Sequence, residues 1–516
     1  MKNKEKSFAK GALILVLFGL VSKVIGAVYR LPLTSIITAE GMGLYQLVFP
    51  VYTLMLTISS SGLPSSISKL ISEHISQRKY KQADKILKVS FVMLIVFSVF
   101  CAILVFVFSG TIAKLQGNEN AKICYLGIAP AIVFVGLISG FRGYFQGQEN
   151  MLPSAISGLI EQLIKLFLGL FFAQKLLAKG IAYAVFGAML GITVSEIVAF
   201  LYLGMVFVIY RKRYRINYLK NEKLFTYKST FKMVISTSIF VTLGALIMPF
   251  GMMIDSAIVV NVLKNSGYSE YSATVLFGLQ SGTVGSIINM PVVVSLSIAT
   301  AILPRVSSKK AKSDLEGMRK DAGQAIFYAL LFALPASFGC LGLAEPILKI
   351  LYRRSLNYDQ IIVAAKILQV ASMGVFYLAL LQVTTGILQG VGMVKVPLIS
   401  LAVGIIIKIV LDLILVRLPY ISILGAEMAS VFCYMIALII NLSVLKYKSI
   451  IHLNFKVVLL FIYSLFAYFS KYLFQMIIKT NINYYLSFFT SVFIVVVVYF
   501  IFVAITFRKE IFKRKA

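Results

Sequence analysis

Long apolar runs recur along this chain from one end to the other, and they constrain its fold more than any other feature. A run of about 20 apolar residues can cross the hydrocarbon core of a bilayer as one helix. Helices are the expected spanning form, because lipid offers the backbone no hydrogen-bond partner. Of the 516 residues, 59% are hydrophobic and only 13% are charged. We therefore predict an all-α integral membrane protein and not a soluble enzyme.

The runs predict about fourteen transmembrane helices. The helix at 275–303 contains several glycines and Pro291, so we expect it to be bent or broken. The first run continues past Lys23 to Arg30 without a cleavage site, which favours a retained helix over a signal peptide. The predicted spans are 10–31, 43–64, 86–109, 123–145, 153–173, 180–210, 233–262, 275–303, 323–351, 361–389, 396–417, 421–445, 455–478 and 483–507.

The distribution of Lys and Arg predicts how these spans are oriented. With the N-terminus in the cytoplasm, 34 of the 50 Lys and Arg residues lie on the cytoplasmic side, 12 lie at the opposite ends and four lie within spans. Cytoplasmic loops of membrane proteins carry such an excess. We therefore expect both termini in the cytoplasm and an even number of spans. Basic loops of this kind meet anionic lipid headgroups, which explains the net charge of +31 without nucleic-acid binding.

The chain also resembles itself at an offset that drifts from 225 to 243 residues. The matching pairs, in order, are Gly19 with Gly244, Gly26 with Gly251, Pro50 with Pro291, Pro64 with Pro304, Gln146 with Gln389, Ser157 with Ser400, Lys165 with Lys408, and Gly187 with Gly425. Such order indicates two parallel six-helix repeats related by an axis along the membrane normal. The alternative is chance matching in apolar sequence. We predict an N-lobe at 1–232, a C-lobe at 233–447, and two added helices with a basic tail at 448–516.

Charges within the first span are the first candidates for a site. A charge near the centre of a spanning helix costs roughly 2.5–3.5 kcal/mol on insertion scales, so it needs a reason. Lys23 and Arg30 share one helix face with Gly19 and Gly26. Two cations on a stripe of small residues indicate a water-filled cavity that attracts an anion. The alternative is that both side chains reach out to lipid headgroups.

Two further spans carry charges at a spacing of four residues. Glu161 and Lys165 can pair in the fifth span, and Lys408 and Asp412 repeat this arrangement in the eleventh. Such charges are candidates for contacts between the lobes or at a gate. The alternative is that the two members of each pair neutralise each other so that the helix can pack.

Other intramembrane charges occur singly. Asp255 stands where the repeat places Arg30, which suggests a gate between the lobes; an acidic residue at the aqueous end of its helix is the alternative. Arg142 is a candidate for contact with a substrate phosphate, or a positive-inside anchor. We assign Glu196 and Glu427 to local packing.

Sequence motifs for catalysis or metal binding are not apparent. The four Cys residues form no CxxC pair and the two His residues are far apart, so we expect no metal site and no cofactor. No G-x-S-x-G or Walker sequence occurs. We therefore do not expect an enzyme.

Several segments resemble a known family. They are SKVIGAVYRLPL at 22–33, GLYQLVFPVY at 43–52, RGYFQG at 142–147 and MLPSAI at 151–156. Together with the two lobes and the added helices, they are similar to the stage V sporulation protein B group of the multidrug/oligosaccharidyl-lipid/polysaccharide exporter superfamily, the polysaccharide biosynthesis flippases.

The resemblance implies a function and a place. It implies a flippase in the bacterial cytoplasmic membrane that moves undecaprenyl-diphosphate-linked oligosaccharides for cell wall, spore cortex or polysaccharide by alternating access around a cationic cavity. Cell-wall synthesis proteins are the expected partners. Proteobacterial lipid II flippases place arginines in helices 2 and 8, which this chain lacks, so the family's cationic residues carry over only to Lys23 and Arg30.

Two alternatives remain open from the sequence. One is a cation-coupled multidrug antiporter of the same superfamily, which would favour acidic residues in the N-lobe. The other is a non-transporting membrane scaffold for envelope assembly.

Overall fold

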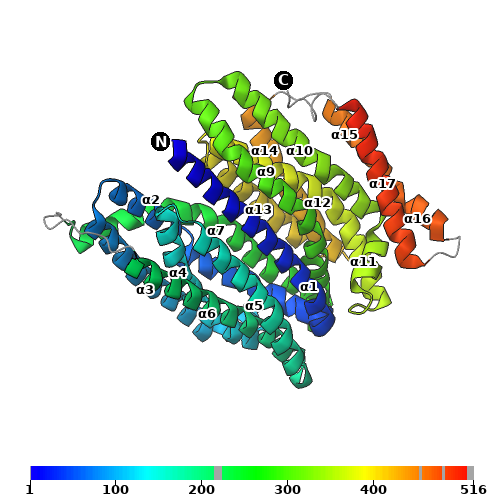
Figure 1. The fold of residues 1–516 in the computed structure, drawn as a ribbon. Helices are drawn as coiled ribbons and strands as arrows, with labels where there is room; N and C mark the ends of the chain where they lie inside the picture. Colours follow the sequence, from blue (N-terminus) through cyan, green and yellow to red (C-terminus); the bar gives the residue numbers. More distant parts are fainter. Residues whose placement is uncertain (1, 214–223, 452–455, 479–482, 508–516) are drawn as a thin grey trace. The chain divides into compact units, whose positions relative to one another are not determined.

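The computed structural model describes residues 2–213, 224–451, 456–478 and 483–507. This part of the chain is helical almost throughout and contains no strand (Figure 1). The α-helices are α1 Lys2–Ser60, α2 Leu63–Ser76, α3 Tyr80–Leu115, α4 Ala121–Gly147, α5 Leu152–Leu176, α6 Ile181–Arg213, α7 Tyr227–Asn265, α8 Glu270–Phe277, α9 Gly285–Ala311, α10 Leu315–Gly342, α11 Ala344–Tyr352, α12 Tyr358–Gly390, α13 Lys395–Leu415, α14 Ile423–Tyr447, α15 Lys456–Tyr468, α16 Ser470–Ile478 and α17 Tyr484–Thr506.

The described helices confirm a multi-pass membrane protein. Twelve helical stretches are long and apolar enough to cross a membrane. Two differences separate this number from the fourteen predicted spans. The spans at 10–31 and 43–64 correspond to two helices that meet at a kink at Thr38, where φ is 61°, and α1 counts them together. The span at 455–478 is divided into α15 and α16, each too short to count alone. The full number of spans and the side of each terminus stay predictions.

The eighth predicted span is interrupted, as its composition indicates. Between α8 and α9, residues Gly278–Val284 form a π-helical segment. Gly278 lies so close to α1 that an added Cβ would overlap the carbonyl oxygen of Ala39. A side chain is therefore excluded at this position by the packing of α1 against the start of the interruption.

Contacts within the chain divide it into two compact units. The first unit contains residues 1–264 and 268–278, and the second contains 265–267 and 279–516. This division falls later than the predicted lobe boundary at 232/233, because α7 and α8 form hydrogen bonds with α3 and with the turn that follows it. The predicted lobes rest on the sequence repeat and remain a prediction.

The first unit is built around α3, α4, α5 and α6, which run side by side (Figure 1). Its apolar core joins α2, α3, α4 and α6, with Ile67, Leu94, Phe145 and Leu203 buried at its centre. Close packing of such side chains stabilises the helix contacts, because helices in a bilayer associate mainly through van der Waals contacts. This core fixes the helices that carry the candidate site described below.

The second unit is built around α9, α10, α12 and α14. The two added C-terminal segments pack onto α10, where Phe338, Leu460 and Tyr499 share one buried cluster. The hydroxyl group of Tyr499 donates a hydrogen bond to the carbonyl oxygen of Leu331 at 3.0 Å. Helices α15 and α17 thus belong to the second unit.

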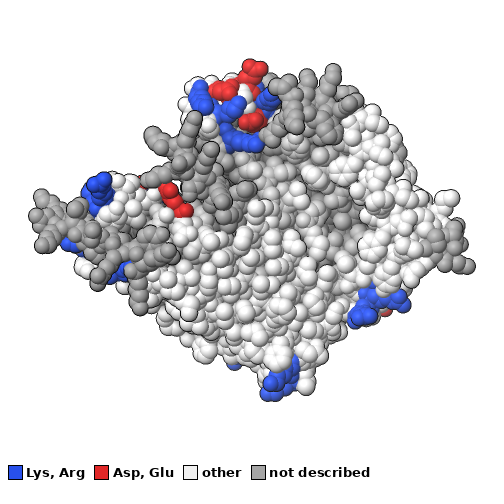
Figure 2. Space-filling model, in the orientation of Figure 1, with Lys and Arg blue, Asp and Glu red and all other residues white. Residues whose placement is uncertain are grey.

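The surface has the character expected of a protein in a bilayer. On the face drawn in Figure 2, charged side chains gather at the ends of helices, and the surface between them is uncharged. Large apolar side chains such as Val92, Phe100 and Phe106 of α3 are more than half exposed. Side chains of this kind are stable on an outer surface when that surface faces hydrocarbon.

Candidate functional site

A cluster of charged side chains lies within the helices of the first unit. Arg142 on α4 donates from Nη2 to Oε2 of Glu161 on α5 at 3.1 Å, and from Nε to Oγ of Ser157 at 3.1 Å. Gln162 donates from Nε2 to the other carboxylate oxygen of Glu161 at 3.2 Å. The side chains of Arg142 and Glu161 are 27% and 20% exposed, so the pair is largely removed from solvent. Arg142 is therefore already bound to a carboxylate of the same unit.

Lys165 lies one helical turn beyond Glu161 but makes a different contact. Its Nζ lies 5.7 Å from the centre of the Tyr29 ring on α1. It also interacts electrostatically with Glu161, Glu196 and Arg30. In place of the predicted ion pair within α5, Glu161 pairs with Nη2 of Arg142 on α4, whose Nε bonds Ser157.

Glu196 on α6, which the sequence analysis assigned to local packing, is a further member of this cluster. Its side chain is 4% exposed and interacts electrostatically with Glu161, Arg142 and Lys165. Tyr52 of α1 is equally buried and interacts with the same carboxylates. The charged and phenolic groups of the cluster lie on four helices, α1, α4, α5 and α6. No local spacing in the sequence could therefore have predicted that they lie together.

Small residues allow α1 to approach α5 and so bring its charged face to the cluster. A Cβ added to Gly26 would lie 3.2 Å from Oε1 of Gln162 on α5, and one added to Gly158 of α5 would lie 3.9 Å from Oγ of Ser22 on α1. Arg30 is half-buried and interacts electrostatically with Lys165. Lys23 is exposed. The cationic face of α1 thus extends from Arg30, which lies at the cluster, to Lys23, which is exposed.

The second unit contains charged and polar pairs of its own. Lys408 and Asp412 on α13 form the predicted pair, with Nζ 2.9 Å from Oδ2 and side chains only 13% and 1% exposed. Gln280 of the π-helical segment donates to Oε2 of Glu427 on α14 at 3.2 Å. Both contacts are made within the second unit, which favours a structural role for them.

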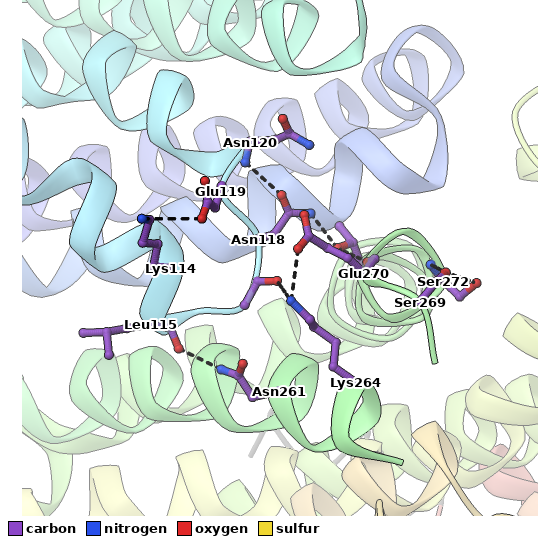
Figure 3. Close-up of polar contacts among 12 residues, drawn as sticks. Lys114, Leu115, Asn118, Glu119, Asn120, Asn261, Lys264, Ser269, Glu270 and Ser272 are labelled. Carbon is purple, nitrogen blue, oxygen red and sulfur yellow. Dashed lines mark hydrogen bonds and ion pairs between the residues drawn. The ribbon is translucent and has the colours of Figure 1, made fainter. Parts of the chain in front are cut away.

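A second set of polar contacts joins the turn between α3 and α4 to α7 and α8 (Figure 3). Lys264 donates to the carbonyl oxygen of Gly117 at 2.8 Å and to Glu270 at 3.0 Å. Asn118 donates to Oγ1 of Thr274 at 2.8 Å, and Asn261 donates to the carbonyl oxygen of Leu115 at 2.7 Å. We call these residues the α3–α4 latch. They explain why α7 and α8 belong to the first unit.

Asp255 lies on the same α7, half-buried and upstream of the latch. Its predicted role opposite Arg30 as a gate stays a prediction. As for metals, no three His, Cys, Asp or Glu side chains of the described ranges are placed to hold an ion together.

Comparison with family models gives two matches. The model described as polysaccharide biosynthesis protein matches residues 8–310, which is more than half of the chain. The MatE model matches residues 241–414. The first match covers α1 to α8 and therefore includes the charged cluster and the latch.

Two similar relatives come from Bacillus subtilis (strain 168). Stage V sporulation protein B is 27% identical over 428 residues, which is 83% of this chain and 81% of the relative. Lipid II flippase MurJ is 24% identical over 456 residues, which is 85% of this chain and 82% of the relative. These alignments span most of both proteins in each case.

Solved structures show the same fold. "Lipid II flippase MurJ, inward closed conformation" matches with a TM-score of 0.70 at 17% identity, over 98% of this chain and 99% of that one. An inward-facing multidrug resistance MATE family transporter of the MOP superfamily matches with a TM-score of 0.67 at 15% identity, over 84% of this chain and 95% of that one. At such identities the likeness establishes the fold alone.

Proposed function

Since this chain belongs to the polysaccharide biosynthesis protein family of the MOP superfamily, we propose that it is a flippase for undecaprenyl-diphosphate-linked oligosaccharides. The family and the fold support a membrane transporter or flippase. The proposal adds the substrate class: a lipid-linked sugar with a diphosphate head. It also proposes that the protein acts in synthesis of the bacterial cell envelope, since one relative is named for sporulation and another for lipid II.

The surplus of positive charge in the cluster of the first unit is the observation that carries this proposal. Arg30, Arg142 and Lys165 contribute three cations, and Glu161 and Glu196 contribute two carboxylates. A bound diphosphate would compensate the surplus, and Lys23 on the exposed part of the same α1 face extends it. Hydrogen bonds to a charged group are worth about 1.5–3 kcal/mol, so such residues can discriminate a diphosphate from a neutral head.

We propose alternating access as the mechanism. The diphosphate binds at the cationic face of α1 on the cytoplasmic side, and the sugar follows it through the protein while the lipid chain stays in the bilayer. Release on the other side requires the cationic face to become accessible there. The protein itself makes and breaks no covalent bond in this scheme, so it acts as a transporter and not as an enzyme.

The test is translocation in liposomes that contain the purified protein and a fluorescent undecaprenyl-diphosphate sugar. An external quencher reports the fraction of sugar on each face. We expect transport by the unmodified protein and a loss of roughly ten-fold or more in Arg30→Ala and Lys23→Ala, because each loses a charge-assisted contact to the diphosphate. Arg30→Lys keeps the charge and should retain part of the rate.

Lys179→Ala is the matched control, because it removes a positive charge from an exposed residue outside the cluster. It should transport at the unmodified rate. Full transport by both Arg30→Ala and Lys23→Ala would remove these residues from the substrate site. Absence of any translocation by protein that is folded in the liposomes would refute the flippase.

A cation-coupled multidrug antiporter is the second candidate. The MatE match and the two carboxylates of the cluster favour it, because antiporters of this kind need an acidic group that binds a cation. Liposomes with an imposed proton or sodium gradient would then export a hydrophobic cationic dye, and Glu196→Gln would abolish export. Translocation of the sugar without dye export would exclude this candidate.

A further inference from the structure

A cavity of about 540 Å³ opens on the surface of the first unit, away from the charged cluster. It lies between the first half of α3 and the start of α7, and both segments belong to the same unit. Its lining includes Lys88, Val92, Val96 and Phe97 of α3 and Lys228 and Phe231 of α7. Nothing in the proposed flippase mechanism uses this place.

The walls of the cavity are held by hydrogen bonds. Gln82 of α3 is 1% exposed and donates from Nε2 to Oγ1 of Thr230 at 3.3 Å. Its Oε1 accepts the backbone N–H of Phe225 at 3.0 Å. Nζ of Lys85 lies 4.0 Å from the centre of the Tyr227 ring and donates to the carbonyl oxygen of Phe225. A buried amide and a lysine thus fix the start of α7 against α3, so the cavity is preformed.

The cavity has an apolar part and a basic end. Val92, Val96 and Phe231 are 61%, 58% and 44% exposed, so a row of apolar side chains faces outward on membrane-spanning helices. A second cavity of about 290 Å³ adjoins the first and shares Lys88 and Tyr227 with it. Its other lining residues are Lys81, Asp84, Lys85 and Leu224.

The charge of the basic end is positive. Lys81, Lys85 and Lys88 follow one face of α3 at spacings of four and three residues. The single carboxylate there, Asp84, forms an ion pair with Arg211 of α6. Lys88 and Lys228 are exposed and form no ion pair with the part of the chain that the structure describes. The basic end can therefore bind an anion that is joined to an apolar chain.

We propose that this cavity binds one anionic phospholipid from the leaflet that surrounds it. Its phosphate lies between Lys88 and Lys228, and one acyl chain lies along Val92, Val96 and Phe231. A phospholipid fits better than a soluble anion, because the apolar part is larger than the basic one and opens toward lipid. The site is independent of the proposed transport function, since it requires only that α3 spans the membrane.

The absence of Trp from the chain allows a direct test. Phe97→Trp places a single indole in the cavity, and its fluorescence in vesicles is quenched by lipids with brominated acyl chains. We compare quenching by brominated phosphatidylglycerol with quenching by brominated phosphatidylcholine. Both lipids carry bromine at the same carbons, so the depth of the indole in the bilayer affects the two measurements equally. We expect a preference on the order of five-fold for phosphatidylglycerol, and loss of it in the Lys88→Gln/Lys228→Gln variant.

Two further single-Trp variants are matched controls. Phe106→Trp places the indole on the exposed face of the same α3 outside the cavity, and Leu303→Trp places it on an exposed stretch of α9 beside Arg305. Both should show nearly equal quenching by the two lipids. An equal preference at Leu303→Trp would show general enrichment of anionic lipid near basic residues and would overturn the site. Preference that persists in Lys88→Gln/Lys228→Gln would overturn the assignment of the headgroup.

Discussion

Buried ion pairs are the residue-scale feature that connects this fold with its proposed function. The pair of Lys408 and Asp412 lies within one helix, and its spacing of four residues made it predictable. The pair of Arg142 and Glu161 joins two helices, and the sequence assigned Glu161 to Lys165 instead. Removing one member of a buried ion pair leaves the other charge unpaired and strongly destabilises the fold, whereas replacing both members with apolar residues costs little stability. Both pairs can therefore be tested by comparing single with double substitutions.

The pair on α13 should act in stability and not in transport. Lys408→Met leaves Asp412 buried without its partner, so we expect the midpoint of thermal unfolding in detergent to fall by several degrees. Replacing both residues, as Lys408→Met/Asp412→Leu, should restore most of the loss and leave sugar translocation unchanged. A folded double variant that does not transport would assign the pair to the mechanism, as sequence analysis allowed.

The pair between α4 and α5 should be coupled to the cationic site. Glu161→Gln frees Arg142 from its carboxylate, and a double-mutant cycle with Arg142→Gln should give a coupling of about 1–3 kcal/mol in unfolding experiments. Because Glu161 also interacts with Lys165, Glu161→Gln should alter the affinity for the diphosphate sugar. Unchanged affinity, together with zero coupling, would show that the two side chains do not act as a pair.

Interruptions of helices decide how the elements are placed. The glycines and the proline of 275–303 predicted the broken helix that appears as α8, the π-helical segment and α9. The break predicted between the spans 10–31 and 43–64 appears as the kink of α1 at Thr38, where the backbone dihedral angles are not helical. A threonine at positive φ is uncommon, so this kink is imposed by packing around it and not by local preference.

The latch shows the same dependence on distant contacts. Lys264→Met/Asn118→Ala removes the side-chain bonds that α7 and α8 make with the turn between α3 and α4. We expect faster amide hydrogen exchange in α8 and in residues 115–120. Exchange requires local opening, and the free energy of that opening falls when these side-chain bonds are absent. Lys114→Met is the control: its pair with Glu119 is 68% and 72% exposed and lies outside α7 and α8. Exchange equal to the control would mean that the latch does not hold these helices.

At the scale of the whole molecule, orientation is a property of the loops and not of any one site. The excess of Lys and Arg predicts that both termini face the cytoplasm. Reporter proteins fused in turn to each end, one active only in the cytoplasm and one only outside, would measure this. Both ends should give the cytoplasmic signal. Signals on opposite sides would show an odd number of spans and would overturn the predicted orientation.

The sequence alone is enough to predict a helical protein that crosses the membrane many times and belongs to the MOP superfamily. Apolar runs and motifs are local, and lipid permits few other structures for such runs. Which charged side chains lie close together depends on how the helices pack in the tertiary structure. Glu196 joined a cluster with Arg142 and Lys165, α7 and α8 joined the first unit, and the lysines of α3 and α7 came to border one apolar cavity. Each of these depends on helices far apart in the chain, whose packing no local pattern specifies.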